Sequence, residues 1–167
     1  MSSTAPVKTA IKSAVDPSVK ARLLEEGYGP GAWHGPDLKA ALADVTSPAA
    51  FWRPGPGRHN IAEVAVHHAW CVRSVVGQLT GKTPGPFPLE GEDWFELPDE
   101  GPLAWPRITA LVEAEQGRLA AAVADLGAGR IRSPLSEPEQ FDLVLGVTCH
   151  AIYHAGQVQL IKRLLQK

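Results

Sequence analysis

Hydrophobic and polar positions alternate with the period of an α-helix in three long stretches of this chain. In the last stretch, apolar side chains return every three or four positions, as they do along one face of a helix. That face contains Leu143, Val147, His150, His154, Val158, Ile161 and Leu165. The pattern predicts a helix over about residues 139–165 that carries His150 and His154 on one face, one turn apart.

The same period predicts two further long helices. The first covers about residues 61–79; Asn60 before it is a good N-cap, and Gly81 after it ends the pattern. The second covers about residues 104–126 and ends at Gly127. Each has one apolar face, so each must pack against a neighbouring helix.

The N-terminal part predicts a first helix in two pieces. Residues 16–26 begin with an N-cap and a proline in the first turn, and this helix is expected to stop at Gly27. A second helical piece is predicted at residues 37–45. Residues 47–60 are dense in Pro and Gly, which indicates a loop.

The connection at residues 82–103 is long and contains prolines, a cluster of acids and the aromatic residues Phe87, Trp94 and Phe95. A loop of this length inside a compact domain is usually functional or without fixed structure. The aromatic side chains indicate that it folds back onto the domain, over a pocket, while its acids are expected to be solvated. Residues 128–138 carry only a weak strand signal.

Together these elements predict an all-α protein, a four-helix bundle with a broken first helix and a long loop between the second and third bundle helices. The chain has 167 residues, enough for one domain with a real core. We assign residues 16–167 to this domain and residues 1–15 to a flexible N-terminal tail. The tail is poor in acids and rich in Ser, Ala and Lys, which also fits a transit-like segment.

Charge and composition narrow the range of partners. The formal net charge is −2, so no basic surface for nucleic acid is expected. No apolar run is long enough for a membrane span, and the first residues lack the apolar core of a signal peptide. Cys71 and Cys149 fall within predicted helices and are expected to be buried free thiols in a reducing cytoplasm. We therefore expect a cytoplasmic protein.

The histidine pair is the main candidate for chemistry. His150 and His154 lie in an apolar stripe, where an unpaired polar group costs roughly 1–3 kcal/mol. One interpretation is a shared divalent transition metal such as Zn, Ni or Fe, and the other is a hydrogen bond from each imidazole to a carbonyl or carboxylate. The helix at residues 61–79 offers a third ligand, His67 or His68, and spacing alone favours His68. Three histidines would leave open coordination positions, as a catalytic metal requires.

Six side chains are candidates for the pocket or for contacts with the ligands: Trp33, His34, His68, Trp94, Tyr153 and Gln157. His34 could reach the pocket mouth or lie exposed in a loop. Tyr153 could donate a hydrogen bond to a substrate or pack against the bundle. Gln157 could support a ligand or lie on the helix surface.

Two motifs carry a family resemblance. HAIYHAGQV, residues 150–158, has two histidines separated by three residues and followed by Ala-Gly-Gln, and NIAEVAVHHAW, residues 60–70, has a histidine after an apolar triplet. These segments are similar to the closing and second-helix motifs of the DinB/YfiT-like superfamily of metal-binding four-helix bundles. WHGPDL and GEDWF also resemble stretches of a bacterial branch of that family. The resemblance covers about residues 20–165.

The resemblance implies His67, His150 and His154 as ligands of one divalent metal. With His67 as the ligand, His68 is expected to be a core histidine bonded to a backbone carbonyl. It also implies a homodimer and a metal-dependent enzyme with a small-molecule substrate. One example is a thiol S-transferase whose metal holds a low-molecular-weight thiol as thiolate. The alternatives are a metal-dependent hydrolase, a non-catalytic metal- or ligand-binding stress-response protein, and a metal-free helical interaction protein.

Overall fold

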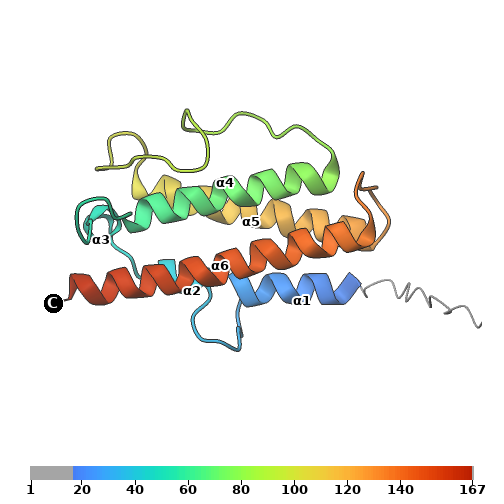
Figure 1. Ribbon diagram of the computed structural model, residues 1–167, viewed down its shortest axis with the longest axis horizontal. Helices are drawn as coiled ribbons and strands as arrows, with labels where there is room; N and C mark the ends of the chain where they lie inside the picture. Colours follow the sequence, from blue (N-terminus) through green and yellow to red (C-terminus); the bar gives the residue numbers. More distant parts are fainter. Residues whose placement is uncertain (1–16, 167) are drawn as a thin grey trace, which may run out of the picture.

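The computed structural model describes residues 17–166, which form six α-helices and, within that range, no strand (Figure 1). The helices are α1 (Pro17–Tyr28), α2 (Leu38–Leu42), α3 (Ser47–Phe51), α4 (Ile61–Thr80), α5 (Trp105–Gly127) and α6 (Glu137–Leu165). The prediction of an all-α protein is confirmed. The tail expected at residues 1–15 lies outside the described residues. Among the helices described, none is both long and apolar enough to cross a membrane.

Helices α1, α4, α5 and α6 form the bundle. α4 packs against α5 and α6, and α1 packs against the same two helices. α1 and α6 run in one direction, and α4 and α5 run in the opposite one (Figure 1). Because α4 and α5 are parallel, residues 81–104 must return along the length of α4, a helix of 20 residues and therefore of about 30 Å. The bundle with a broken first helix and a long loop is thus confirmed.

The cap residues define where the long helices begin and end. At the start of α4, the side chain of Asn60 accepts a hydrogen bond from the N–H of Glu63 (2.8 Å), and the Asn60 N–H donates to the Glu63 carboxylate (3.3 Å). This reciprocal pair confirms the predicted N-cap. At the other end, Gly81 has φ +68°, a left-handed conformation that glycine adopts without steric cost.

Several predicted boundaries are wrong. α6 begins at Glu137, about two residues early, because the N–H of Ser136 is capped by Glu139 and the first turn tolerates a proline. Residues 47–60 are not all loop: Ser47–Phe51 form α3, again with a proline in the first turn, while α2 is shorter than predicted. The weak strand signal at 128–138 corresponds to the turn before α6.

α1 also continues through Gly27 instead of stopping there. A Cβ atom at this position would lie 3.0 Å from the Cβ of Ala151 and 3.2 Å from the backbone oxygen of Thr148. Gly27 therefore allows α1 to pack closely against α6. The absence of a side chain matters here for helix packing and not for a turn. The contact lies directly beside His150 in α6.

The long connection folds back onto the domain, as predicted. Phe95 and Leu97 are buried in the core. The Asn60 side chain donates to the Leu97 carbonyl (2.7 Å), and the Leu97 N–H donates to the Glu63 carboxylate (3.1 Å). These bonds tie the loop to the start of α4, and this attachment holds Asp93 just before it against the bundle.

Candidate metal centre

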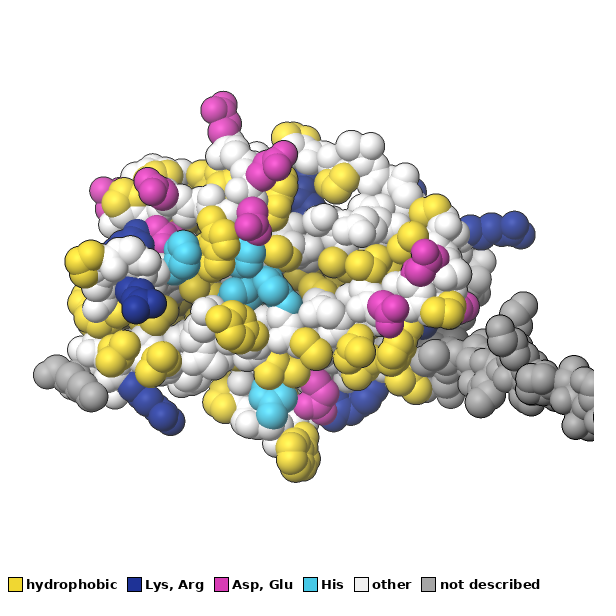
Figure 2. Space-filling model, viewed as in Figure 1, with side chains coloured by type: hydrophobic (Ala, Val, Ile, Leu, Met, Phe, Trp, Pro, Cys, Tyr) yellow, Lys and Arg dark blue, Asp and Glu magenta, His cyan; other side chains and the backbone are white. Residues whose placement is uncertain are grey.

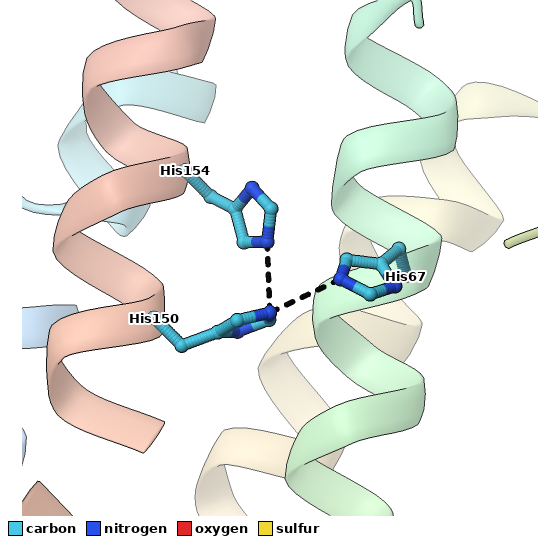
Figure 3. A group of neighbouring side chains, drawn as sticks. All are labelled: His67, His150 and His154. Atoms are coloured by element: carbon cyan, nitrogen blue, oxygen red, sulfur yellow. Dashed lines mark hydrogen bonds between the residues drawn. The ribbon is translucent and has the colours of Figure 1, made fainter. Parts of the chain in front are cut away.

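Three histidine side chains converge in the bundle, one from α4 and two from α6. His150 lies between the other two: its Nε2 is 3.1 Å from Nε2 of His67 and 2.9 Å from Nε2 of His154 (Figure 3). Nitrogen ligands of a tetrahedral zinc ion are about 3.3 Å apart, given Zn–N bonds of about 2.0–2.1 Å. The three side chains could therefore hold one metal ion.

Hydrogen bonds at the far side of two rings orient these nitrogens. The Nδ1–H of His67 donates to the backbone carbonyl of Asp93 (3.0 Å), and the Nδ1–H of His154 donates to Oε1 of Gln157 (2.6 Å). A carbonyl oxygen only accepts, so the hydrogen sits on Nδ1 and leaves a lone pair on Nε2. Gln157, a candidate from the sequence, thus contacts a candidate ligand in the way that supports metal binding.

His68 lies behind His150 and is fully buried. Its Nδ1 is 3.3 Å from Nδ1 of His150, and its Nε2 is 2.6 Å from the side-chain amide of Gln116 in α5. The expected backbone carbonyl partner is therefore wrong, because its partners are two side chains. The amide atom nearest to His68 is Nε2 of Gln116, and turning the amide over puts its oxygen in the same place. In the turned arrangement His68 donates to this oxygen and accepts the Nδ1–H of His150, which frees Nε2 of His150.

The choice between His67 and His68 follows from this geometry. Only Nε2 of His67 joins the nitrogens of His150 and His154, which agrees with the resemblance and not with the spacing. Spacing could not separate the two because every residue from Ile61 to Ala69 is buried. A helix surrounded on several sides has no single apolar stripe from which to read its orientation.

His150 and His154 are neutral at pH 7. Burial, with a contribution from neighbouring histidines, lowers the pKa of His150 to about 4 and the pKa of His154 to about 4. Burial also holds the pKa of His68 well below its ordinary value. A neutral imidazole keeps the nitrogen lone pair that a metal requires.

The loop before α5 covers one side of the cluster. The ring of Trp94 is stacked on His67, with centroids 3.9 Å apart and planes 4° apart, and it also stacks on His59 at 3.8 Å. Among the residues that the structure describes, Asp93 is the one residue other than glycine with a positive φ (+62°). Its backbone oxygen is 3.0 Å and its Oδ1 is 3.1 Å from Nδ1 of His67. Figure 2 shows a group of histidine side chains near the centre of one face, with hydrophobic side chains beside it, and another histidine apart from this group.

The remaining candidates from the sequence are spread over the molecule. Tyr153 is exposed, with its ring centroid 5.4 Å from that of His154. Trp33 and His34 are also exposed, on the link between α1 and α2. Their hydrogen bonds go to Glu26, from the Trp33 N–H to the carboxylate and from the His34 ring to the backbone oxygen, both 2.8 Å long. The structure does not bring these two residues to the histidine cluster.

The two cysteines differ from each other. Cys71 is half-buried, with its Sγ 3.8 Å from Nε2 and 3.9 Å from Nδ1 of His67, and burial raises the pKa of its thiol to about 11. Cys149 is exposed, so the prediction of a buried thiol is wrong there. It follows the buried Thr148, and successive helical residues are about 100° apart around the axis.

Sequence reasoning missed three contacts of the cluster. Cys71 follows His67 by four residues, the same spacing that identified His150 and His154, and this signal was available. Gln116 is a polar residue in the buried face of α5, which is a weaker sign. Asp93 lies in an acidic run that was expected to be solvated, and nothing local distinguishes it from its acidic neighbours.

The fold and the site define a class of protein, a four-helix bundle whose facing helices carry histidines that could hold a metal. A family model, the DinB superfamily, matches residues 32–158, a range that contains all three histidines. This chain belongs to the DinB superfamily. No curated protein and no solved structure gave a significant match.

Proposed function

We propose that His67, His150 and His154 bind one divalent transition metal, Zn, Ni or Fe, and that the protein is a metal-dependent enzyme. The observation that carries this proposal is that the three Nε2 atoms converge. Hydrogen bonds at Nδ1 orient the rings of His67 and His154. Imidazole nitrogens are suited to these metals and not to Mg or Ca. A metal with three protein ligands keeps a position open, at which a bound thiol or water becomes more acidic.

We further propose a low-molecular-weight thiol as the co-substrate of an S-transferase reaction. In that reaction the thiol sulfur bonds to an electrophilic carbon, the leaving group departs with its electron pair, and the thiol proton goes to solvent. The positive charge of a divalent metal at this site would favour binding of an anionic thiolate over a protonated amine. Trp94 shields His67 from water, and the ring of Tyr153 lies beside that of His154.

A groove of about 440 Å³ supports a small-molecule substrate. It is lined by residues that include Arg58, His59, Gln157 and Leu160. Two of these connect it to the cluster, because Gln157 contacts His154 and His59 stacks on Trp94. Volumes of this order are usual for small-molecule sites, and Arg58 would favour an electrophile that carries a negative charge.

The expected homodimer remains part of the proposal. Outside the proposed substrate groove, α6 exposes the large apolar side chains of Leu145 and Leu165. Apolar side chains on one helix favour burial against a second copy, and a two-fold dimer would bury the same surface on both chains. Sedimentation velocity of the purified chain tests this expectation, and a monomer at all concentrations would contradict it.

Elemental analysis tests the metal. Wild-type protein should carry at least one transition-metal ion per chain after gel filtration, and His150→Ala and His154→Ala should each lose one. His34→Ala is the matched control, because this exposed histidine bonds to Glu26 and should leave the metal content unchanged. If the wild type neither contains nor takes up metal, the enzyme proposal fails. Where metal is found, small thiols and electrophiles are screened, with His150→Ala as the blank.

A further inference from the structure

We infer that His67, Cys71 and Asp93 form a second metal site, for a thiophilic divalent ion such as Zn²⁺ or Co²⁺. One donor atom from each of the three side chains lies within 4.8 Å of the others. Nδ1 of His67 is 3.1 Å from Oδ1 of Asp93 and 3.9 Å from Sγ of Cys71. This group goes beyond the proposed three-histidine site, with which it shares one imidazole.

The distances suit a tetrahedral ion. With Zn–S bonds of about 2.3 Å and Zn–N or Zn–O bonds of about 2.0–2.1 Å, sulfur and nitrogen ligands are about 3.6 Å apart, and nitrogen and oxygen about 3.3 Å. The observed separations of 3.9 and 3.1 Å differ from these values by a few tenths of an ångström. Small rotations of the three side chains would therefore complete the site.

Two elements bring the three donors together. His67 and Cys71 are four residues apart on α4, so they lie one turn apart on one face. Asp93 reaches them from the long connection, where its positive φ turns both its backbone oxygen and its Oδ1 towards His67. The hydrogen bonds of Leu97 to Asn60 and Glu63 hold that segment against α4.

The donor set selects the class of ion. A thiolate, an imidazole and a carboxylate prefer zinc and its neighbours, whereas Mg and Ca prefer oxygen ligands alone. A thiol that coordinates a metal ion loses its proton, so binding of the ion would convert the Cys71 thiol to a thiolate. The Asp93 carboxylate is largely exposed, which leaves the site open to solvent and free to add a water or a small anionic ligand.

The shared imidazole couples the two sites. Nε2 of His67 faces His150, while Nδ1 on the other side of the ring faces Asp93. Binding at the second site releases the proton of the Cys71 thiol to solvent. If the three-histidine site is empty, the hydrogen on Nδ1 of His67 moves to Nε2 of the same ring; if that site is filled, this proton is also released. The hydrogen bond from Nδ1 to the Asp93 carbonyl is then replaced by a bond to the ion. When both sites are filled, His67 bridges them, and each ion changes the affinity of the other.

Titration of the metal-free full-length protein with Co²⁺ tests this inference. Thiolate-to-cobalt charge transfer gives a near-ultraviolet band that histidine and carboxylate ligands do not give. We expect the band in the wild type and in Cys149→Ser, which removes the exposed thiol as a matched control. Cys71→Ser should abolish it, and Asp93→Asn should weaken Co²⁺ binding in this site at least about tenfold. Asparagine tolerates the positive φ of this position, so folding should be retained.

The histidine variants separate this site from the proposed catalytic one. His150→Ala and His154→Ala should keep the charge-transfer band while they lose the three-histidine site, and His67→Ala should lose both. Absence of the band in the wild type, or its persistence in Cys71→Ser, would overturn the second site without affecting the first. Its loss in Cys149→Ser would do the same, because it would assign the thiolate to the exposed cysteine.

Discussion

Nδ1 of His68 and Nδ1 of His150 lie 3.3 Å apart, so the histidine buried behind the cluster directly contacts a candidate metal ligand. The chain continues to Gln116, whose side-chain amide lies 2.6 Å from the other nitrogen of His68. Two ring nitrogens at this distance must share one hydrogen. The three residues therefore decide together which nitrogen of His150 keeps its lone pair.

Replacing His68 should weaken metal binding without removing a ligand. In His68→Phe, Nδ1 of His150 loses its acceptor within the core, and we expect the metal affinity of the three-histidine site to fall about 10–100-fold. His68→Gln keeps a side-chain acceptor and should lose less. Competition with a chromophoric chelator gives the affinities, and ¹⁵N NMR of the imidazoles reports the tautomer of His150. Equal affinities in wild type and His68→Phe would contradict this role.

The approach of α1 to α6 makes a prediction about stability. Gly27→Ala would place a Cβ 3.0 Å from that of Ala151 and 3.2 Å from a backbone oxygen, and we expect a loss of about 1–3 kcal/mol in the free energy of unfolding. Gly146→Ala is the control within α6, because a Cβ there meets nothing within 4 Å. That substitution should stabilise the protein by about 0.5–1 kcal/mol. Urea unfolding measures both, and a neutral Gly27→Ala would mean that the helices shift apart freely.

Glu63 predicts a pH dependence. Burial alone would raise its pKa, but hydrogen bonds from Arg53, the Leu97 N–H and His59 hold the pKa below its ordinary value of 4.5. The folded state therefore binds fewer protons at this group than the unfolded state. The stability that Glu63 contributes is complete above pH 4.5 and is lost as the pH falls through the lowered pKa.

Comparison with Glu63→Gln isolates this carboxylate from other titrating groups. At pH 7 the variant should be about 1–3 kcal/mol less stable, since the Arg53 guanidinium loses its charged partner. The difference should shrink below pH 4.5, where the wild-type carboxyl becomes protonated and resembles the amide. Urea unfolding of both proteins at a series of pH values measures it. A difference that is constant down to the acid limit would show that Glu63 does not act through its charge.

The histidine pair on α6 could be predicted from the sequence because it depends only on the spacing of residues within one helix. His150 and His154 fall on one face of a helix whose period is clear, and the cap at Asn60 equally defines where α4 begins. The third candidate ligand could not be derived in this way, because α4 is buried on all sides near His67 and the choice depends on its rotation in the bundle. The family resemblance favoured His67, whereas the hydrophobic period of α4 did not.

The remaining contacts of the site depend on tertiary structure. Asp93 and Trp94 reach His67 only because Phe95 and Leu97, a few residues on, are buried in the core. Gln116 comes from a third helix and meets His68 through packing of α4 against α5. Trp94 was a candidate because an aromatic side chain in a long loop tends to fold back onto the domain. No pattern within these segments predicts the contacts of Asp93 and Gln116, so local reasoning missed both.

Gln157 gives the sharpest test of support for a ligand, because one position allows opposite changes. In the wild type, Oε1 of Gln157 lies 2.6 Å from Nδ1 of His154 and accepts its hydrogen. Gln157→Leu removes this acceptor and should weaken metal binding about 10–100-fold. Gln157→Glu supplies a carboxylate, which accepts this hydrogen bond more strongly and makes the imidazole a better donor to the metal, so affinity should rise. Gln159→Leu, two positions further along α6, is the control and should behave as wild type. If both Gln157 variants bind metal equally, the amide does not orient His154, and the ligand geometry must come from helix packing alone.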